Sequence, residues 1–161
     1  MIIDILKEEN CHKWVIDHSV AVCKKATKLS KNFDVDLELI KQGSLLHDIG
    51  RSRTNKIEHG IIGSKIAIDH GFDEKIAKII ERHVGAGISK EEAKLLGLPE
   101  NDYIPITLEE KIVAHSDNLL NGSDEVDLDF TINKWKSKMD NYQIPVERIK
   151  KLHKELVLQF E

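Results

Sequence analysis

The pair His47-Asp48 places an imidazole beside a carboxylate, at the end of an apolar helical pattern and just before Gly50. Apolar positions recur at helical spacing from Leu37 to His47, so the imidazole is predicted to lie on the buried face of a helix. A buried carboxylate needs a cation or hydrogen-bond donors beside it, because an isolated charge is costly in the protein interior. A lone histidine at such a place can also be a hydrogen-bonded core residue. The positions of the other histidines and acids therefore decide between a metal site and a structural role.

More metal-ligating side chains fall on apolar helix faces elsewhere in the chain. Together with the first pair they form one candidate set: His18, His47, Asp48, His59, His83 and Asp117. Each of these polar groups would cost about 1–3 kcal/mol if it were buried without a partner. A cation would satisfy all of them at once. Imidazole and carboxylate ligands without thiolate favour one or two divalent transition ions (Fe, Mn, Co, Ni or Zn) and leave positions open for water.

The remaining histidines have no aligned partners and serve as controls: His12, His70, His115 and His153. We expect these histidines to be structural or at the surface. For example, His115 lies two residues from Asp117 and therefore faces another side of its helix. Cys11 and Cys23 are predicted on one helix, about 18 Å apart, which is too far for a disulfide. A reduced, cytoplasmic protein is the expectation.

Three cations follow the His-Asp pair within a short polar stretch: Arg51, Arg53 and Lys56. The stretch is either a solvated loop or a clamp for phosphate or carboxylate. Its place directly after the pair favours the clamp. A second stretch, residues 84–106, is long and flanked by glycine, so it is either a lid or an ordinary connection.

Composition and periodicity predict a single all-α domain over residues 1–161. Hydrophobic residues make up 40% of the chain, charged residues 32%, and the net charge is −4. This charge argues against a broad nucleic-acid surface, and no apolar run approaches the roughly 20 residues of a membrane span. Helical periodicity without sustained alternation indicates helices over about 2–9, 10–31, 34 or 36 to 48, 57–70, 73–83, 89–96, 107–120, 127–140 and 145–160.

Polar residues at several of these starts are expected to cap the helices. Asn10 and Asp73 are candidate caps, and the stretches 89–92 and 107–110 are capping-box signals. Gly63 is expected to let one helix approach a neighbour closely.

The two C-terminal helices show packing faces and no chemistry of their own. The first presents Phe130, Trp135 and Met139 to a core, although Trp135-Lys136 could border a ligand. Few aromatic residues lie near the predicted ligands, so nothing in the sequence specifies a nucleobase. These helices are expected to pack on a core of about 12–122 or on a second subunit, which makes a homodimer possible.

The ordered set His18-Ser19, His47-Asp48-Ile49-Gly50, His83 and Asp117 resembles the HD superfamily of metal-dependent phosphohydrolases, over roughly residues 12–122. The resemblance implies a compact helical bundle of the HD-domain type. It also implies hydrolysis of a phosphate ester or anhydride.

Two further motifs, residues 58–63 around His59 and residues 81–83 ending in His83, are similar to the branch with two extra histidines. That branch includes bacterial diadenosine tetraphosphate hydrolases and cyclic-dinucleotide phosphodiesterases. It implies that Asp48 bridges two ions, that His18, His47 and Asp117 hold one, and that His59 and His83 hold the other. The chain departs from the branch in two ways: the Gly-Tyr-Pro motif is absent, which argues against a cyclic dinucleotide, and Arg51 replaces the common lysine.

The predicted activity is therefore cleavage of a small anionic phosphorylated substrate, most simply a nucleotide, by a metal-activated water. Asp48, Arg51 and Arg53 are the candidate catalytic residues, and Arg51, Arg53 and Lys56 the candidate phosphate-binding ones. Glu58 or Asn118 could orient a water or a sugar hydroxyl. Two alternatives remain: a di-iron oxygenase of HD type, and an HD module that senses a nucleotide without turnover.

Overall fold

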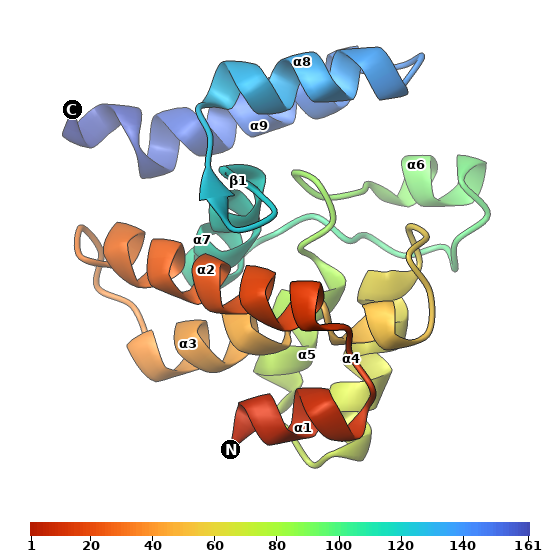
Figure 1. The fold of residues 1–161 in the computed structure, drawn as a ribbon. Helices are drawn as coiled ribbons and strands as arrows, with labels where there is room; N and C mark the ends of the chain where they lie inside the picture. Colours follow the sequence, from red (N-terminus) through yellow and green to blue (C-terminus); the bar gives the residue numbers. More distant parts are fainter.

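Helices make up most of the computed structural model, which describes residues 1–161. The all-α prediction is confirmed, since the only sheet is a hairpin of two two-residue strands (Figure 1). In chain order the elements are α1 (Ile2–Glu8), α2 (Lys13–Ser30), α3 (Leu37–Leu46), η1 (Ile49–Ser52), α4 (His59–Asp69), α5 (Glu74–Glu81), α6 (Lys90–Leu95), α7 (Leu108–Asn118), β1 (Leu120–Asn121), β2 (Asp124–Glu125), α8 (Leu128–Lys138), α9 (Gln143–Leu156) and η2 (Leu158–Phe160). None of the helices combines the length and the apolar character that a membrane crossing requires.

Capping side chains set several of the predicted helix starts. The Asp36 carboxylate accepts a hydrogen bond from a backbone N–H at 3.0 Å and begins α3, which decides between Asp34 and Asp36. Asp73 caps α5, and Ser89 begins α6 with a complete capping box. Thr107 caps α7. Short polar side chains at these positions satisfy N–H groups that the first helical turn leaves free.

The start of α2 differs from the sequence prediction. Asn10 adopts a left-handed conformation with φ 62° and ends α1 instead of capping α2. The N–H of Asn10 donates to the carbonyl of Lys7, and that of Cys11 to the carbonyl of Leu6, as in a Schellman motif. Asparagine visits this conformation more readily than most residues, so α2 begins only at Lys13.

Other boundaries shift for related local reasons. Cys11 precedes α2, so it does not share a helix with Cys23, although both are free thiols. His83 lies beyond the last residue of α5 rather than on the helix. Pro145 lies in the first turn of α9 instead of before it, where its missing N–H is tolerated.

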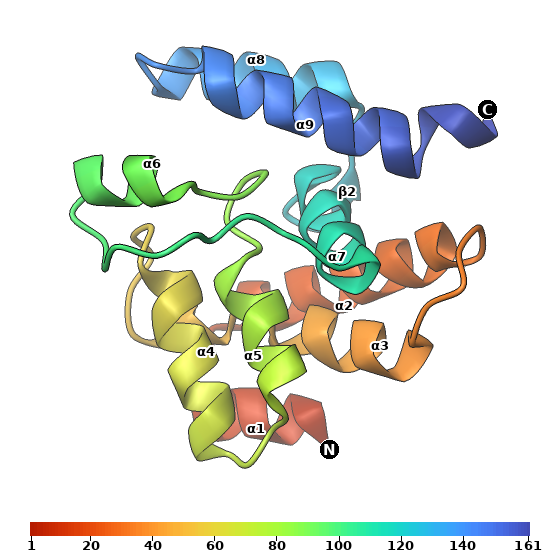
Figure 2. The same cartoon turned by 180° about the vertical axis from the view of Figure 1, so that it is seen from behind.

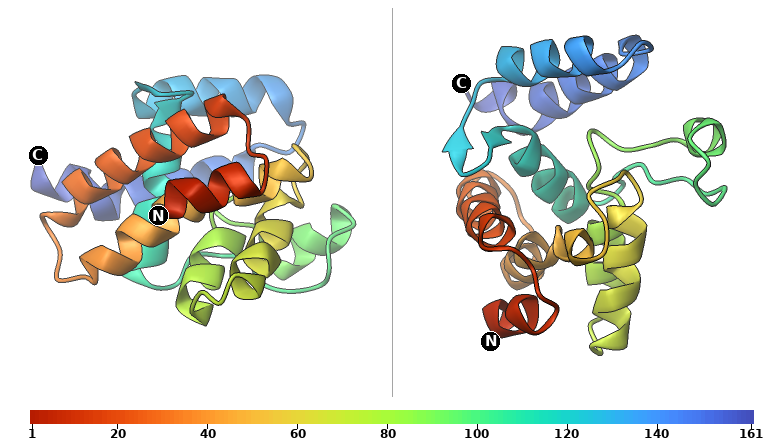
Figure 3. Two further views of the ribbon diagram at one scale, coloured as in Figure 1. Left: turned by 60° about the horizontal axis from the view of Figure 1, so that its bottom comes forward. Right: turned by 45° about the vertical axis from the view of Figure 1, so that its right-hand side comes forward.

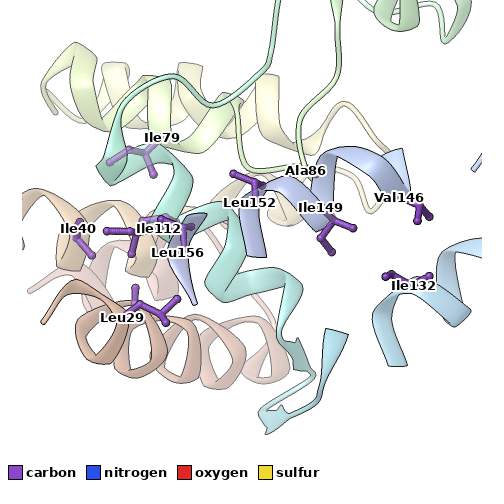
Figure 4. Close-up of a cluster of buried hydrophobic side chains, with 12 residues drawn as sticks. Leu29, Ile40, Ile79, Ala86, Ile112, Ile132, Val146, Ile149, Leu152 and Leu156 are labelled. Carbon is purple, nitrogen blue, oxygen red and sulfur yellow. The ribbon is translucent and has the colours of Figure 1, made fainter. Parts of the chain in front are cut away.

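The helices form two connected packing regions. The larger hydrophobic cluster joins α2, α3, α5 and α7 to α9, through residues that include Leu29, Ile40, Ile79, Ile112 and Leu156 (Figure 4). A second cluster joins α1 to α2–α5. Figures 2 and 3 show α8 and α9 as an antiparallel pair at the end of the molecule opposite α1. Helix α7 lies between this pair and the remaining helices.

The aromatic residues of α8 do not pack as the sequence predicted. Phe130 and Met139 are 43% and 37% exposed, whereas Thr131 and Ile132 are buried. Only Trp135 packs partly against the main cluster. The expectation that Phe130 and Met139 face the core is wrong, because the buried face of α8 carries Thr131, Ile132 and the partly buried Trp135. Phe130 lies on another side of the helix, and Met139 follows its last residue.

Residues 84–106 form an excursion with a small cluster of its own. Ile88 and Tyr103 pair through two backbone hydrogen bonds of 3.3 and 2.8 Å. The Arg148 guanidinium of α9 donates to the carbonyl of Gly87 and to the carboxylate of Glu92, both at 2.7 Å. These bonds connect residues 84–106 to α9. Whether the segment acts as a lid stays a prediction.

Candidate metal centre

The structure brings the six predicted ligands together around Asp48. On one side of this carboxylate, Oδ2 lies 3.7 Å from His18 Nε2 and 3.6 Å from His47 Nε2. Asp117 closes this group, with its Oδ1 2.8 Å from His18 Nε2 and 3.6 Å from His47 Nε2. Two imidazoles and two carboxylates thus face one another at the end of α7.

The other carboxylate oxygen of Asp48 faces a different pair of histidines. Its Oδ1 lies 3.3 Å from His59 Nε2 and 3.2 Å from His83 Nε2. The two Nε2 atoms lie 3.1 Å from each other. Asp48 therefore stands between two groups of side chains, with one carboxylate oxygen toward each.

Main-chain carbonyl groups fix the orientation of all four imidazoles. The Nδ1 atoms lie 2.5–2.8 Å from these oxygens, in the pairs His18–Gly122, His47–Ser44, His59–Lys56 and His83–Ile80. A carbonyl can only accept, so each Nδ1 carries the proton and donates it. The Nε2 atom of each ring is left to face the carboxylates, as in metal-ligating histidines held by an outer partner.

Protons alone satisfy this arrangement poorly, and a cation fits it. His47 Nε2 and Asp48 Oδ1 are buried and have no hydrogen-bond partner. Between His59 and His83, a single proton can serve only one of the contacts that the two Nε2 atoms make. A divalent ion accepts several nitrogen and oxygen ligands at once, so the donor set suits a metal site.

The electrostatics of the centre point the same way. Burial alone would lower the pKa of His47, but the carboxylates of Asp48 and Asp117 raise it to about 9. Burial would raise the pKa of Asp48, yet the imidazoles of His47, His59 and His83 hold it well below its usual range. The pKa of Asp117 is lowered in the same way, against its burial, by His18 and His47. Both carboxylates are therefore ionised, and they concentrate negative charge where a cation would bind.

Glycine allows the elements around the centre to approach closely. A Cβ atom at Gly50 would lie only 1.8 Å from the carbonyl oxygen of His59 and 2.8 Å from the nitrogen of Gly63. Only glycine fits at this position, so it lets the start of α4 rest on the segment that carries Asp48. Gly63 meets Gly50 from the other side, as the expected close approach requires.

Of the three predicted cations, the structure brings one to the centre. Arg51 Nε lies 3.0 Å from Asp48 Oδ2, and its guanidinium lies over the Trp14 ring at 5.7 Å. Arg53 instead forms an ion pair with Glu9. Lys56 is exposed, and only its carbonyl reaches the site, where it holds His59.

A pocket of ≈320 Å³ opens onto the Asp117 side of the centre. His18, Asp48 and Asp117 form its inner wall, whereas His47, His59 and His83 do not line it. The rest of the wall includes residues that the sequence did not bring together: Trp14, Arg51, Asn118, Phe130, Lys134 and Trp135. Glu58 is not among the lining residues, so Asn118 is the better placed of the two predicted orienting groups.

The four control histidines lie outside the centre. His115 is fully buried, and its Nε2 lies 2.9 Å from His153 Nδ1. Burial lowers the pKa of His115 to about 3. His70 contacts the Glu9 carboxylate at 2.7 Å, and His12 is exposed just before α2.

The HD domain family model matches residues 15–122, which contain all six ligands. The chain belongs to the HD domain family. Helix α8, which contributes to the pocket, and helix α9 lie beyond the matched part of this HD protein.

Its relatives differ in length and name. An uncharacterized protein of Methanocaldococcus jannaschii is 50% identical over 91% of this chain and 89% of its own length. A tRNA (cytidine(56)-2'-O)-methyltransferase of Picrophilus torridus is 46% identical over 94% of this chain, which spans only 44% of that enzyme. Ribonuclease Y of Petrotoga mobilis is 29% identical over 65% of this chain and 18% of its own length.

Among solved structures, the HD domain of the L. monocytogenes phosphodiesterase PgpH in complex with cyclic-di-AMP has the same fold. The TM-score is 0.62 at 16% identity, and the match covers 96% of this chain and 94% of that one. The HD-type helical fold implied by the sequence resemblance is thereby confirmed.

Proposed function

We propose that this HD protein is a metal-dependent phosphohydrolase that cleaves a phosphate ester or anhydride of a nucleotide. The observation that carries the proposal is the division of the ligands between the two oxygens of Asp48. His18, His47 and Asp117 would hold one ion. His59 and His83, whose Nε2 atoms lie beside the other oxygen of Asp48, would hold a second, with Asp48 shared between them. Divalent ions in such sites polarise phosphoryl oxygens and lower the pKa of water.

The residues of the chain supply the rest of the chemistry. Backbone carbonyls hold the four imidazoles in the orientation a ligand needs. Arg51 would neutralise phosphate charge at the inner end of the pocket, because it lies beside Asp48 and is partly exposed. Lys134 would do the same from α8. Arg53 is engaged with Glu9, so we assign it no part in binding the substrate.

The names of similar proteins support the reaction class. PgpH is named a phosphodiesterase and ribonuclease Y a ribonuclease, and both names describe cleavage of phosphate diesters. Cyclic-di-AMP itself is a weaker candidate for this chain, because the Gly-Tyr-Pro motif of cyclic-dinucleotide enzymes is absent from the sequence.

A second candidate substrate is the end of an RNA strand. Relatives at 46% and 39% identity are named tRNA methyltransferases, and this chain spans 44% of each. Attachment of a similar segment to an RNA-modifying enzyme favours an RNA-linked phosphodiester over a free metabolite.

The first experiment is to measure metal content per chain in protein purified anaerobically, without chelator or metal-affinity tag. We expect close to two ions, mostly iron or manganese. Turnover is then assayed anaerobically with Mn²⁺ or Co²⁺ on nucleotides, dinucleoside polyphosphates and phosphodiesters. His18→Ala should lose metal and turnover together, whereas His12→Ala should lose neither, since His12 is exposed and outside the centre.

Each other outcome has a defined meaning. Turnover that requires bound iron and O₂ would identify an oxygenase instead. Saturable nucleotide binding without product under every metal would identify a sensing module. No metal after reconstitution would end the proposal.

A further inference from the structure

Both tryptophans of this chain lie in one place. Trp14, at the start of α2, and Trp135, on α8, line the pocket beside Asp48. Phe130 joins them from the preceding turn of α8. Trp14 is more than 110 residues from Phe130 and Trp135 in the sequence and lies on another helix, so the meeting of the three rings at this pocket is a property of the fold. Figure 1 shows the two helices, α2 and α8.

These rings are not simply core residues. Trp14 is 50% exposed and Phe130 is 43% exposed, and both turn exposed surface into a polar pocket. Large aromatic faces left open beside charged groups mark a ligand site more often than chance packing. A nucleobase is a ligand that such faces accept, because every base can stack on an aromatic ring.

The charges of the pocket suit the other half of a nucleotide. Arg51 and Lys134 are the only arginine and lysine among the lining residues, and they come from different elements, η1 and α8. Arg51 lies between Asp48 and the Trp14 ring, so it joins the metal centre to the aromatic wall.

One polar side chain that lines the pocket also has an unsatisfied hydrogen-bond donor. Asn118 is 6% exposed, lines the pocket, and its Nδ2 is buried without a hydrogen-bond partner. An unpaired buried donor is costly, and an oxygen of a ligand would accept from it once the side chain turns its Nδ2 toward the pocket.

From these observations we infer that the pocket binds one nucleotide unit, with its base on the aromatic wall of Trp14, Phe130 and Trp135 and its phosphate at Arg51 and Lys134. The volume of ≈320 Å³ lies at the lower end of small-molecule pockets, about 300–1,000 Å³, which suits one unit and not two. The inference rests on the proposed function for the reaction and for the cations that offset Asp48 and Asp117 beside the phosphate. Stacking of the base rests on the walls of the pocket alone. Helix α8, outside the part of the chain matched by the family model, would then select the substrate.

The unit could be a free nucleotide or the end of an RNA strand. A second pocket beside the β1–β2 hairpin shares Leu120 with the first and is lined by Lys24, Lys28 and Lys25, the last paired with Glu125. A longer strand could continue there. The two sources share the same base and phosphate chemistry at the aromatic wall.

Tryptophan fluorescence tests the inference directly, because both tryptophans lie in the pocket. The metal-loaded protein is titrated with AMP, with ribose 5-phosphate and with a short oligoribonucleotide, and quenching is read immediately after mixing. We expect AMP to quench and ribose 5-phosphate not to. Tighter binding of the oligoribonucleotide than of AMP would identify an RNA end as the source, and weaker binding would identify the free nucleotide.

A matched pair of variants separates stacking from general effects. Phe130→Ala should weaken AMP binding roughly 5- to 100-fold, the worth of stacking one base. Binding of ribose 5-phosphate, measured by calorimetry, should stay unchanged. Phe160→Ala is the control, because Phe160 is similarly exposed (46%) and does not line the pocket. Both side chains are partly exposed, so both variants should fold, as circular dichroism can verify.

The inference and the proposed function can fail separately. If ribose 5-phosphate binds and is cleaved as well as AMP, or Phe130→Ala changes nothing, the base pocket is overturned and the hydrolase remains. If AMP quenches and Phe130→Ala weakens it, but no phosphate ester is cleaved under any metal, the base pocket remains and the hydrolase falls.

Discussion

Two groups of histidines meet in the interior, and only one of them surrounds carboxylates. His59 and His83 approach to 3.1 Å beside Asp48, and His115 and His153 approach to 2.9 Å with no acid among their contacts. In the first group burial lowers the pKa of His83, but the acids raise the pKa of the neighbouring His47 to about 9 despite its burial. In the second, burial lowers the pKa of His115 to about 3.

The comparison shows that contact between imidazoles does not identify a metal site. In the pair of His115 and His153, one proton between two nitrogens satisfies the contact and no charge is needed. At the centre, fixed Nδ1 donors and ionised carboxylates leave Nε2 atoms that only a cation or additional protons can satisfy. Carboxylates and carbonyl tethers, not histidine density, make the difference.

The largest difference between the two histidine groups should appear when the shared carboxylate of Asp48 is removed. Asp48→Ala should abolish metal retention and turnover together, because both ligand groups depend on it. His115→Leu, which removes a histidine from the other group, should retain the metal content of the wild-type chain. Metal analysis and an activity assay on both variants measure this. An unimpaired Asp48→Ala enzyme would contradict the metal-centre assignment.

Steric disruption of the centre should be nearly as severe. Gly50→Ala would place a methyl group 1.8 Å from the His59 carbonyl, so α4 must move away from Asp48. We expect a loss of about 4 kcal/mol or more in the free energy of unfolding, as for other severe steric changes. Gly71→Ala is the control, since nothing lies within 4 Å and only its φ of +85° is strained, at a cost of about 1 kcal/mol. Urea unfolding distinguishes the two, and equal losses would show that crowding is not the cause.

The second histidine group should make the fold sensitive to acid. The pKa of His115 in the folded chain, about 3, lies below its value of about 6.5 in an unfolded chain. The unfolded state therefore binds the proton more readily, so this contribution to stability is intact above pH ~6.5 and is lost as the pH falls toward 3. We expect a loss on the order of a few kcal/mol, measured by urea unfolding against pH. His115→Leu should flatten the profile in this range, and a parallel profile would assign the acid sensitivity to other groups.

The smallest expected effect concerns Arg51. Arg51→Lys keeps the charge beside Asp48 but loses the planar group over Trp14. A partly exposed cation–π contact is worth about 0.5–1 kcal/mol, so KM should rise roughly two- to fivefold while metal content stays the same. Steady-state kinetics check this. Arg53→Lys should leave KM unchanged, because Arg53 pairs with Glu9 away from the pocket.

Periodicity within single helices correctly predicted which histidines and acids meet at the centre. His18, His47 and Asp117 each follow an apolar stripe, and a residue on such a stripe must point to the core. His83 was placed on its helix although it lies after the helix end, yet it still points inward because its Nδ1 bonds the Ile80 carbonyl. Local spacing is therefore sufficient to predict that a side chain points inward when its helix buries a single face.

The pocket could not be predicted in the same way. Trp135 shares one side of α8 with the buried Thr131 and Ile132, whereas Phe130 lies on another side. Which side faces α7 depends on the packing of the C-terminal pair, and no local pattern encodes it. Trp14 meets these rings only through the tertiary fold. The charged residue Arg53 was misplaced for a similar reason, because its partner Glu9 lies 44 residues away.

The carbonyl tethers of the four imidazoles have a consequence for how this centre can change over evolutionary time. A side-chain partner can be removed by a single amino-acid substitution. A main-chain carbonyl cannot, because every residue type carries the same carbonyl group. Replacing Ser44, Lys56 or Ile80 leaves the acceptor atom in place. The orientation of these three imidazoles is thus robust to point mutation, and changing it requires redirecting the ends of α3 and α5 or the start of α4. The acceptor of His18 is different, because Gly122 has a φ of +63°, where a side chain is strained.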